Sequence, residues 1–283
     1  MTTIDDVLQT VPEPAGADVR VDPVRYDHEG TPLLGVLAKD AAIAGRRPAV
    51  LVVHDWHGVN EHVEARVTML ARLGYVAFGA DVYGEGVRPS DDTAAQVAGS
   101  FYQDLPLMRA RVRAGLDRLL EDPDVDPARV VVMGYCFGGS AALELARTGA
   151  DLVGAVSFHG GLLTHDPSDA ADVRAKLLVL TGAADPVVPD EKVHAWQDEM
   201  RAAPGVDWQV VTYAGAMHAF AVPGTDAPDH GAQYQARADR RSWRALEVFL
   251  AEVFDEELVA LWGPTRRGRA RGGLDWRSGP QLL

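Results

Sequence analysis

The order of apolar and polar residues along the chain predicts strands that alternate with helices. Two short runs of strand-forming residues flank Gly30 and predict an antiparallel hairpin over residues 24–37. Six later runs are predicted to be strands, and residues 49–53 are continuously apolar, which is typical of a strand covered by helices on both faces. These runs are residues 49–53, 75–80, 129–133, 152–158, 177–181 and 208–213.

Helices are expected between most of these runs. Asn60 begins one that Gly74 ends, and Pro106 begins another. Two more are expected at residues 140–147 and 189–202. A last helix carries apolar residues at helical spacing, namely Leu246, Phe249, Leu250 and Val253. The pattern predicts an α/β fold with a mostly parallel, doubly wound sheet, in which functional residues gather at the carboxyl ends of the strands.

The only cysteine of the chain lies between a predicted strand and a predicted helix, in the sequence Gly-Tyr-Cys-Phe-Gly-Gly at residues 134–139. This order is typical of a nucleophile elbow, where the strained turn requires small neighbours. Gly134 and Gly138 meet that requirement. A thiol has a pKa of roughly 8.5, and a helix N-terminus or a nearby histidine lowers it. Cys136 is therefore a candidate nucleophile, although a buried structural cysteine is the alternative.

Partners for Cys136 are expected downstream, because the hydrolase order on such a sheet is nucleophile, acid and histidine. Asp185 and His218 each follow a predicted strand. His218 is the candidate base, and Asp185 is the candidate acid that orients it. A loop acid and an exposed loop histidine are the alternatives for the two residues taken singly.

An oxyanion would need two N–H donors. The amide of Phe137 is one candidate, and the amide of Trp56, in the loop of residues 54–60, is the other. His159 and the two glycines after it resemble part of a lipase oxyanion motif, but they follow the nucleophile instead of preceding it. We interpret them as a loop beside the site, with His159 structural.

Composition narrows the remaining possibilities. The net charge of −14 argues against binding of nucleic acid, and a single cysteine excludes an internal disulfide. Neither a secretory signal nor an apolar run long enough for a bilayer is found, so a cytoplasmic protein without membrane attachment is expected. His54, His57 and His62 lie close together in the sequence, but their spacing fits no helical zinc motif, and no metal is expected.

Three segments are expected. Residues 1–21 form a polar N-terminal segment, residues 22–255 the α/β domain, and residues 256–283 a basic extension. The arginines of the extension are Arg266, Arg267, Arg269, Arg271 and Arg277. We interpret it as a flexible, solvated segment; docking on an acidic surface is the alternative.

Several sequence blocks resemble the dienelactone hydrolase family, whose members are carboxymethylenebutenolidase-like α/β-hydrolases. The resemblance covers residues 26–254. Its blocks are residues 54–60, 74–77, 81–84, 134–139, 185–186 and 218–220. The Gly-Tyr-Cys-x-Gly-Gly block is specific to this family among hydrolases. The resemblance implies an α/β-hydrolase fold, a triad of Cys136, His218 and Asp185, and hydrolysis of an ester or lactone without a cofactor.

The same resemblance assigns further residues around the thiol. Asp55 stands where the family has a glutamate that helps to ionise the thiol, so it is the candidate for thiol activation. Glu85 and Val222 stand at positions where arginines of the family grip a substrate carboxylate, which points to a different acyl substrate. Arg88 is near enough to replace those arginines.

An apolar pocket for the acyl or ring group is expected around the thiol. The residues expected to shape it are Trp56, His57, Tyr83 and Phe220. A small-molecule ester or lactone is the expected partner, and the oligomeric state stays open. A non-catalytic scaffold with the same fold is the main alternative. Carbon–halogen cleavage is disfavoured, because on this fold it uses a carboxylate nucleophile.

Overall fold

The structure is a computed structural model that describes residues 2–163 and 165–255 of the 283. Its centre is an eight-stranded sheet with the order β1-β2-β4-β3-β5-β6-β7-β8. The strands are β1 (Val19–His28), β2 (Thr31–Asp40), β3 (Arg47–Val53), β4 (Val76–Ala80), β5 (Val125–Tyr135), β6 (Gly154–Phe158), β7 (Lys176–Gly182) and β8 (Trp208–Tyr213). From β4 to β8 all neighbours are parallel, whereas β1 and β2 form the predicted antiparallel hairpin. The predicted α/β fold, with a mostly parallel sheet and an N-terminal antiparallel hairpin, is observed.

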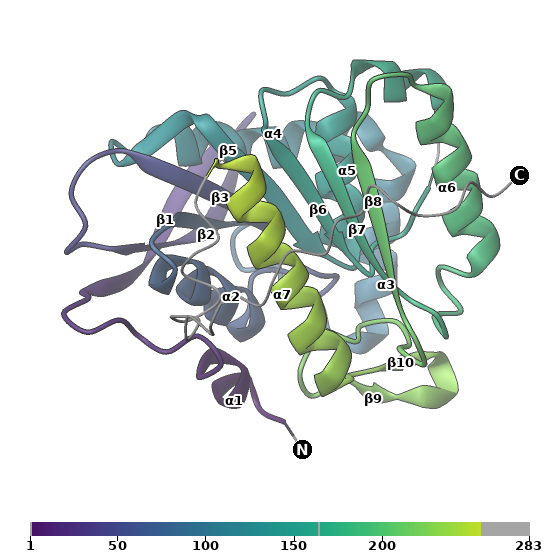
Figure 1. The fold of residues 1–283 in the computed structure, drawn as a ribbon, viewed down its shortest axis with the longest axis horizontal. Coiled ribbons are helices and arrows are strands. Elements are labelled where there is room, and N and C mark those ends of the chain that lie inside the picture. The colour runs from purple at the N-terminus through teal and green to yellow at the C-terminus, as the bar shows by residue number, and fades with distance from the viewer. Residues whose placement is uncertain (1, 164, 256–283) are drawn as a thin grey trace, which may run out of the picture.

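Helices cover both faces of this sheet, and α7 crosses the face nearest the viewer in Figure 1. One apolar cluster contains side chains of α1 (Ile4–Leu8), α2 (Glu61–Arg72) and α7 (Ala236–Val253). A second cluster contains side chains of α3 (Asp91–Gln103), α4 (Leu105–Leu120), α5 (Phe137–Arg147) and α6 (Asp190–Ala202). Shorter elements complete the fold: η1 (Pro167–Asp172), β9 (Asp226–Ala227), η2 (Pro228–His230) and β10 (Ala232–Gln233).

Local sequence signals explain several boundaries. Gly30 has a φ of 79° in the hairpin turn, a value that glycine adopts without strain. The side chain of Asn60 accepts hydrogen bonds from the N–H groups of His62 and Val63, so it caps α2. The predicted start of α2 is therefore observed, and its predicted end lies close to the observed C-cap at Leu73.

Two helices were not predicted from the sequence. Within residues 1–21, set apart above as a polar segment, α1 forms and Val7 and Val11 are buried in the apolar cluster that includes α2. The second is α3, whose buried face consists only of Ala94, Ala98 and Phe101. Such weak apolar patterns are poor predictors of helix. The basic extension at residues 256–283 lies outside the described residues.

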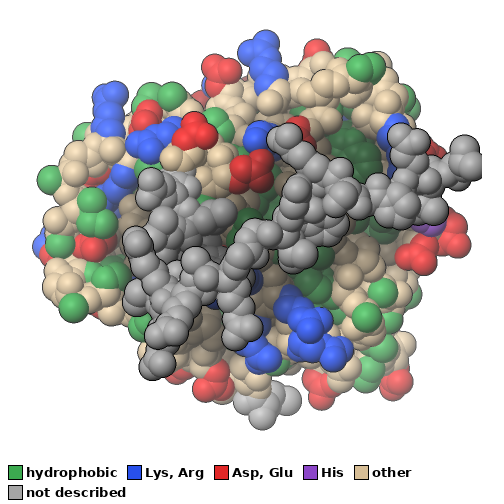
Figure 2. Space-filling view, viewed as in Figure 1, with side chains coloured by type: hydrophobic (Ala, Val, Ile, Leu, Met, Phe, Trp, Pro, Cys, Tyr) green, Lys and Arg blue, Asp and Glu red, His purple; other side chains and the backbone are tan. Residues whose placement is uncertain are grey.

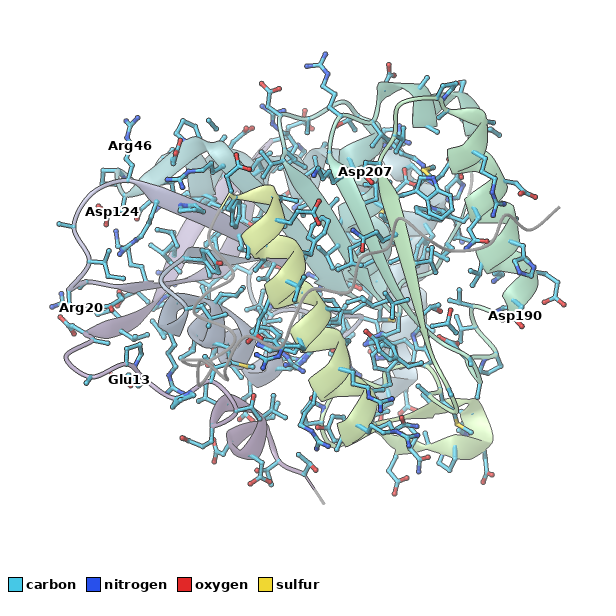
Figure 3. All side chains as sticks on the ribbon, in the orientation of Figure 1. Glu13, Arg20, Arg46, Asp124, Asp190 and Asp207 are labelled. Atoms are coloured by element: carbon cyan, nitrogen blue, oxygen red, sulfur yellow. The ribbon has the colours of Figure 1, made fainter. Side chains whose placement is uncertain are left out.

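Charged side chains mostly project from the periphery, as those of Glu13, Arg20, Arg46, Asp190 and Asp207 do in Figure 3. On the face that carries α7, acidic and basic side chains are interspersed (Figure 2), so the net negative charge does not gather in one patch there. Within the described residues, no helix combines the length and the apolar character needed to cross a membrane.

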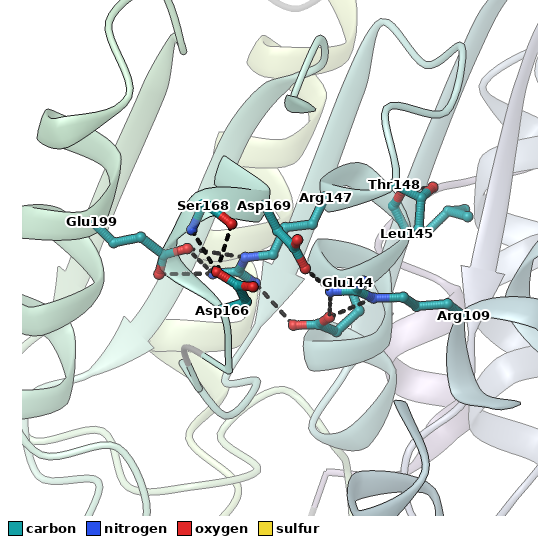
Figure 4. Close-up of polar contacts among 9 residues, drawn as sticks. All are labelled: Arg109, Glu144, Leu145, Arg147, Thr148, Asp166, Ser168, Asp169 and Glu199. Atoms are coloured by element: carbon teal, nitrogen blue, oxygen red, sulfur yellow. Dashed lines mark hydrogen bonds and ion pairs between the residues drawn. The ribbon is translucent and has the colours of Figure 1, made fainter. Parts of the chain in front are cut away.

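A group of buried charges is the exception. Arg147 of α5 pairs with Glu199 of α6 at 2.9 Å and with Glu144 at 3.1 Å (Figure 4). Arg109 of α4 pairs with Glu144 and with Asp169 of η1. These ion pairs tie α5 directly to α4 and α6, and through Arg109 to η1. The helix α5 is the one that begins directly after Cys136.

Candidate active site

The turn between β5 and α5 holds Cys136 in a strained backbone conformation with φ 52° and ψ −113°. A β-carbon on Gly134 would lie 2.2 Å from the carbonyl carbon of Gly138. A β-carbon on Gly138 would lie 2.2 Å from the carbonyl oxygen of Val53. The turn therefore excludes any larger residue at these positions, and the partly exposed thiol stands at the carboxyl end of β5.

Three side chains from separate loops meet at this turn. The Nε2 atom of His218 lies 3.1 Å from the Sγ atom of Cys136, and its Nδ1 atom lies 2.9 Å from Oδ2 of Asp185. The other carboxylate oxygen of Asp185 accepts hydrogen bonds from the N–H groups of Val187 and Val188. Asp185 is thus fixed by its own loop and can hold the Nδ1 proton of His218, which leaves Nε2 facing the sulfur.

The electrostatic surroundings of His218 favour its protonated form. Burial alone would lower its pKa, but a negative charge on Cys136 and the carboxylate of Asp185 together raise the pKa of His218 to about 10. The sulfur and the imidazole therefore form a coupled pair that can share one proton.

The loop that carries His218 is held by main-chain hydrogen bonds. The N–H of His218 donates to the carbonyl of Gly231, and its own carbonyl accepts from Gln233 of β10. Phe220, expected above to shape the pocket, is fully buried and packs on Tyr213 and on His159. The structure thus places Phe220 in the core beside His159 and Tyr213, without exposure at the surface.

His159 occupies the same buried layer. Its φ is 40°, and its ring centroid lies 5.3 Å from that of His218. Burial, followed by the charges of His218 and His62, keeps the pKa of His159 well below its usual value. These features fit the structural interpretation of His159.

The two candidate oxyanion donors come from two loops. The N–H of Phe137 belongs to the first residue of α5, where a helix supplies no acceptor. Among the backbone hydrogen bonds of the described residues, neither the N–H of Phe137 nor that of Trp56 has an acceptor. Trp56 is 36% exposed, so this residue lies at the surface of the protein.

The two histidines in the loop of residues 54–60, His54 and His57, lie in different surroundings. His54 is fully buried; its Nδ1–H donates to the carbonyl of Asp55 and its Nε2 accepts from Val82, while burial lowers its pKa to about 4. His57 lies near the surface, with Nδ1 3.1 Å from the carbonyl of Pro89. In the part of the chain that the structure describes, no group of three His, Cys, Asp or Glu side chains is arranged to bind a metal ion.

The phenol of Tyr83 lies within electrostatic reach of the thiol. Its pKa is raised by burial and then by the charges of Cys136, Tyr102 and Asp55. Its ring packs 5.1 Å from that of Phe137, and its hydroxyl has no hydrogen-bond partner among the described residues. A buried hydroxyl without a partner near the thiol is well suited to contact a substrate.

Tyr102 was not predicted to lie near the site, because the helix that carries it, α3, was not predicted. Its hydroxyl donates to Oγ of Ser140, which in turn donates to the carbonyl of Gly161. Its pKa is also raised by burial and by the charge of Cys136, which places it in the same surroundings.

Arg88 lies beside the loop of Trp56 but is engaged. Its Nη1 atom donates to the carbonyl of Val87 and lies 4.0 Å from the carboxylate of Asp81. Glu85, at one of the positions where the family has an arginine, pairs with Arg25 at 2.7 Å. Arg88 is the cation that the sequence analysis proposed for a substrate carboxylate, and it stays a candidate.

The chain is similar to known proteins over most of its length. A model of the dienelactone hydrolase family matches residues 33–254. A putative carboxymethylenebutenolidase of Methylorubrum extorquens is 28% identical over 219 residues, which are 73% of this chain and 72% of that protein. A probable 2-oxo-3-(5-oxofuran-2-ylidene)propanoate lactonase of Bradyrhizobium sp. is 28% identical over 243 residues, which are 82% of this chain and 94% of that protein.

A solved structure is also similar. It is that of a dienelactone hydrolase-like promiscuous phosphotriesterase from metagenomic libraries, with 38% sequence identity and a TM-score of 0.80. The match covers 84% of this chain and 100% of the other.

Proposed function

This chain belongs to the dienelactone hydrolase family, and on that basis we propose that it hydrolyses a carboxylic ester or lactone through an acyl-enzyme intermediate on Cys136. The observation that carries the proposal is the contact chain from Sγ of Cys136 to Nε2 of His218, at 3.1 Å, and from Nδ1 of His218 to Asp185, at 2.9 Å. Nucleophile, base and orienting acid are all within contact distance of their partners.

Acylation begins when His218 takes the thiol proton and the sulfur attacks the ester carbonyl carbon. A C–S bond forms, and the carbonyl π electrons move to the oxygen. The N–H groups of Phe137 and Trp56 are the proposed donors to that oxyanion. When the intermediate collapses, the ester C–O bond breaks, and the imidazolium of His218 gives its proton to the departing alkoxide.

Deacylation reverses these roles with water as the nucleophile. His218 removes a proton from the water as its oxygen attacks the thioester carbon. The C–S bond then breaks, the thiol recovers its proton through His218, and a carboxylic acid leaves. Asp185 holds the imidazole in the same tautomer during both halves and stabilises its positive form.

Other residues are proposed to adapt this chemistry to a substrate. Asp55 is the candidate for thiol activation, and Tyr83, His57 and Arg88 are the candidates for substrate contacts. Because Arg88 is engaged by Val87 and Asp81, we favour an acyl substrate other than dienelactone.

A second substrate class is suggested by the 38% identical phosphotriesterase structure. In that reaction the sulfur would attack phosphorus, form a P–S bond and expel an aryloxide, and water would then cleave the P–S bond. The same triad would serve both reactions, with phosphorus in place of the carbonyl carbon.

Alkylation of the single thiol tests the proposal. Because the chain has only one cysteine, iodoacetamide modifies Cys136 alone among thiols. We expect hydrolysis of nitrophenyl acetate, measured by nitrophenolate release, to fall in proportion to the fraction of alkylated protein. A nitrophenyl phosphotriester measured in parallel should lose its hydrolysis in the same proportion.

Excess ester present during alkylation should slow the modification, because substrate and reagent compete for the same sulfur. Full hydrolytic activity in completely alkylated protein would contradict the proposal and would favour a non-catalytic scaffold with incidental surface reactivity.

A further inference from the structure

The fully buried side chain of Arg66 connects the loop that carries His218 to two helices. The Nη2 atom of Arg66, on α2, donates to the carbonyl of Ala221 at 2.8 Å and to Asp239 of α7 at 2.6 Å. Its guanidinium also lies over the rings of Tyr135 and Trp243, at 5.4 and 5.2 Å from their centroids. Ala221 is part of the loop that carries His218, so Arg66 connects that loop to α2 and α7.

Arg66 also determines the tautomer of a buried histidine. Its Nε atom donates to Nε2 of His62 at 3.2 Å, so Nε2 is an acceptor and the imidazole proton resides on Nδ1. Burial, followed by the charge of Arg66, keeps the pKa of His62 well below its usual value. The imidazole of His62 is therefore neutral, and its one N–H group is at Nδ1.

That donor faces Asp55. The Nδ1 atom of His62 lies 3.9 Å from Oδ2 of Asp55, and it has no hydrogen-bond partner among the described residues. The other oxygen of Asp55 accepts the N–H of His57 at 2.9 Å. A buried donor without an acceptor is unfavourable, so a closer contact between this N–H and Asp55 is favoured.

Asp55 needs such support because it is buried. Burial raises the pKa of its carboxyl group, which favours the neutral acid. A hydrogen bond to the charged form acts in the opposite direction. An N–H from His62 therefore favours ionised Asp55 at lower pH than burial alone would allow.

We propose that His62, oriented by Arg66, is a positioning residue whose Nδ1–H keeps Asp55 ionised and in place on the loop of residues 54–60. The proposal rests on the proposed function, in which Asp55 assists the thiol. The groups that face His62 are Arg66 of the same helix α2, Asp55 of the preceding loop, the carbonyl of Ala221, and Tyr135 of β5, whose ring centroid lies 4.6 Å away. His159, after β6, is within electrostatic reach.

Two substitutions of His62 test the roles of its two ring nitrogen atoms, Nδ1 and Nε2, separately. In His62→Asn the amide nitrogen can occupy the place of Nδ1 and donate to Asp55, but nothing replaces Nε2. In His62→Gln the amide oxygen can replace Nε2 as acceptor for Arg66, but no donor reaches Asp55. Replacement of Arg66 is avoided, because it would leave Asp239 as a buried carboxylate without its cation.

The measurement is kcat/KM for nitrophenyl acetate from pH 5 to 9. We expect the acid limb of His62→Gln to move to higher pH, so that its loss of kcat/KM is up to about tenfold larger at pH 6 than at pH 9. The acid limb of His62→Asn should stay at the wild-type pH, whatever its overall rate. Both variants must first show a cooperative thermal transition.

A double-mutant cycle with Asp55→Asn provides the control, because that side chain has no charge to lose. In the Asp55→Asn background, His62→Gln should cause no further movement of the acid limb. The proposal is overturned if the limb still moves there, or if both His62 variants lose activity equally at every pH. Failure of the proposed function would instead appear as activity that survives alkylation of Cys136.

Discussion

Replacement of Cys136 by alanine is expected to lower kcat/KM for nitrophenyl esters by about 10⁴- to 10⁶-fold, the range found when a triad nucleophile is removed. Without the sulfur, no thioester forms, and His218 can only assist direct attack by water. The oxyanion donors and the pocket remain, so a small residual rate is expected.

The fold should survive this change. Cysteine and alanine both carry a β-carbon, so the positive φ at position 136 is strained equally in both. Thermal unfolding should therefore show similar midpoints for the two proteins. Cys136→Ser is the matched control with a hydroxyl in place of the thiol: loss of most activity there too would attribute the rate to the ionisable sulfur. Wild-type kcat/KM in Cys136→Ala would remove Cys136 from the mechanism.

Replacement of Arg147 by methionine is expected to lower the free energy of unfolding by about 3–5 kcal/mol. Arg147 is 5% exposed and lies between Glu144 and Glu199 (Figure 4). Its removal leaves these two buried carboxylates with one cation fewer, and methionine restores only the apolar volume. Denaturant unfolding gives the difference directly.

Arg113→Met is the matched control. Arg113 makes the same kind of ion pair with Asp117 of α4, but both side chains are more than half exposed. Exposed pairs contribute about 0–1 kcal/mol, so this variant should unfold close to the wild type. Equal effects of the two substitutions would show that the buried pairs do not hold α5 in place.

The sequence predicts the parts of this protein that depend on local chemistry. Gly30 and Asn60 have conformational or capping roles that follow from residue type, and both were placed correctly. Gly134 and Gly138 are required by close backbone approach, which is also a local property. The apolar strand runs are 5 to 7 residues long, which is too short for most helices, and their alternation with helical patterns predicts the α/β class.

What the sequence does not predict depends on contacts between distant residues. Arg66, Arg147 and Glu199 are buried, yet on an isolated helix pattern such residues are typical of the solvent face. Only the packing of α2 against α7, and of α5 against α6, shows that their charges are enclosed. Phe220 was expected to shape the pocket, whereas its side chain is fully buried between His159 and Tyr213.

Detection of the acyl-enzyme tests the central claim most directly. Nitrophenyl acetate is mixed with the protein, the reaction is quenched with acid before the first turnover is complete, and the intact mass and the peptide that carries Cys136 are measured. The proposed mechanism predicts one acetyl group per chain, attached to Cys136, together with a burst of nitrophenolate of equal amount. Turnover without acetylated Cys136, or with the acetyl group on another residue, would contradict it.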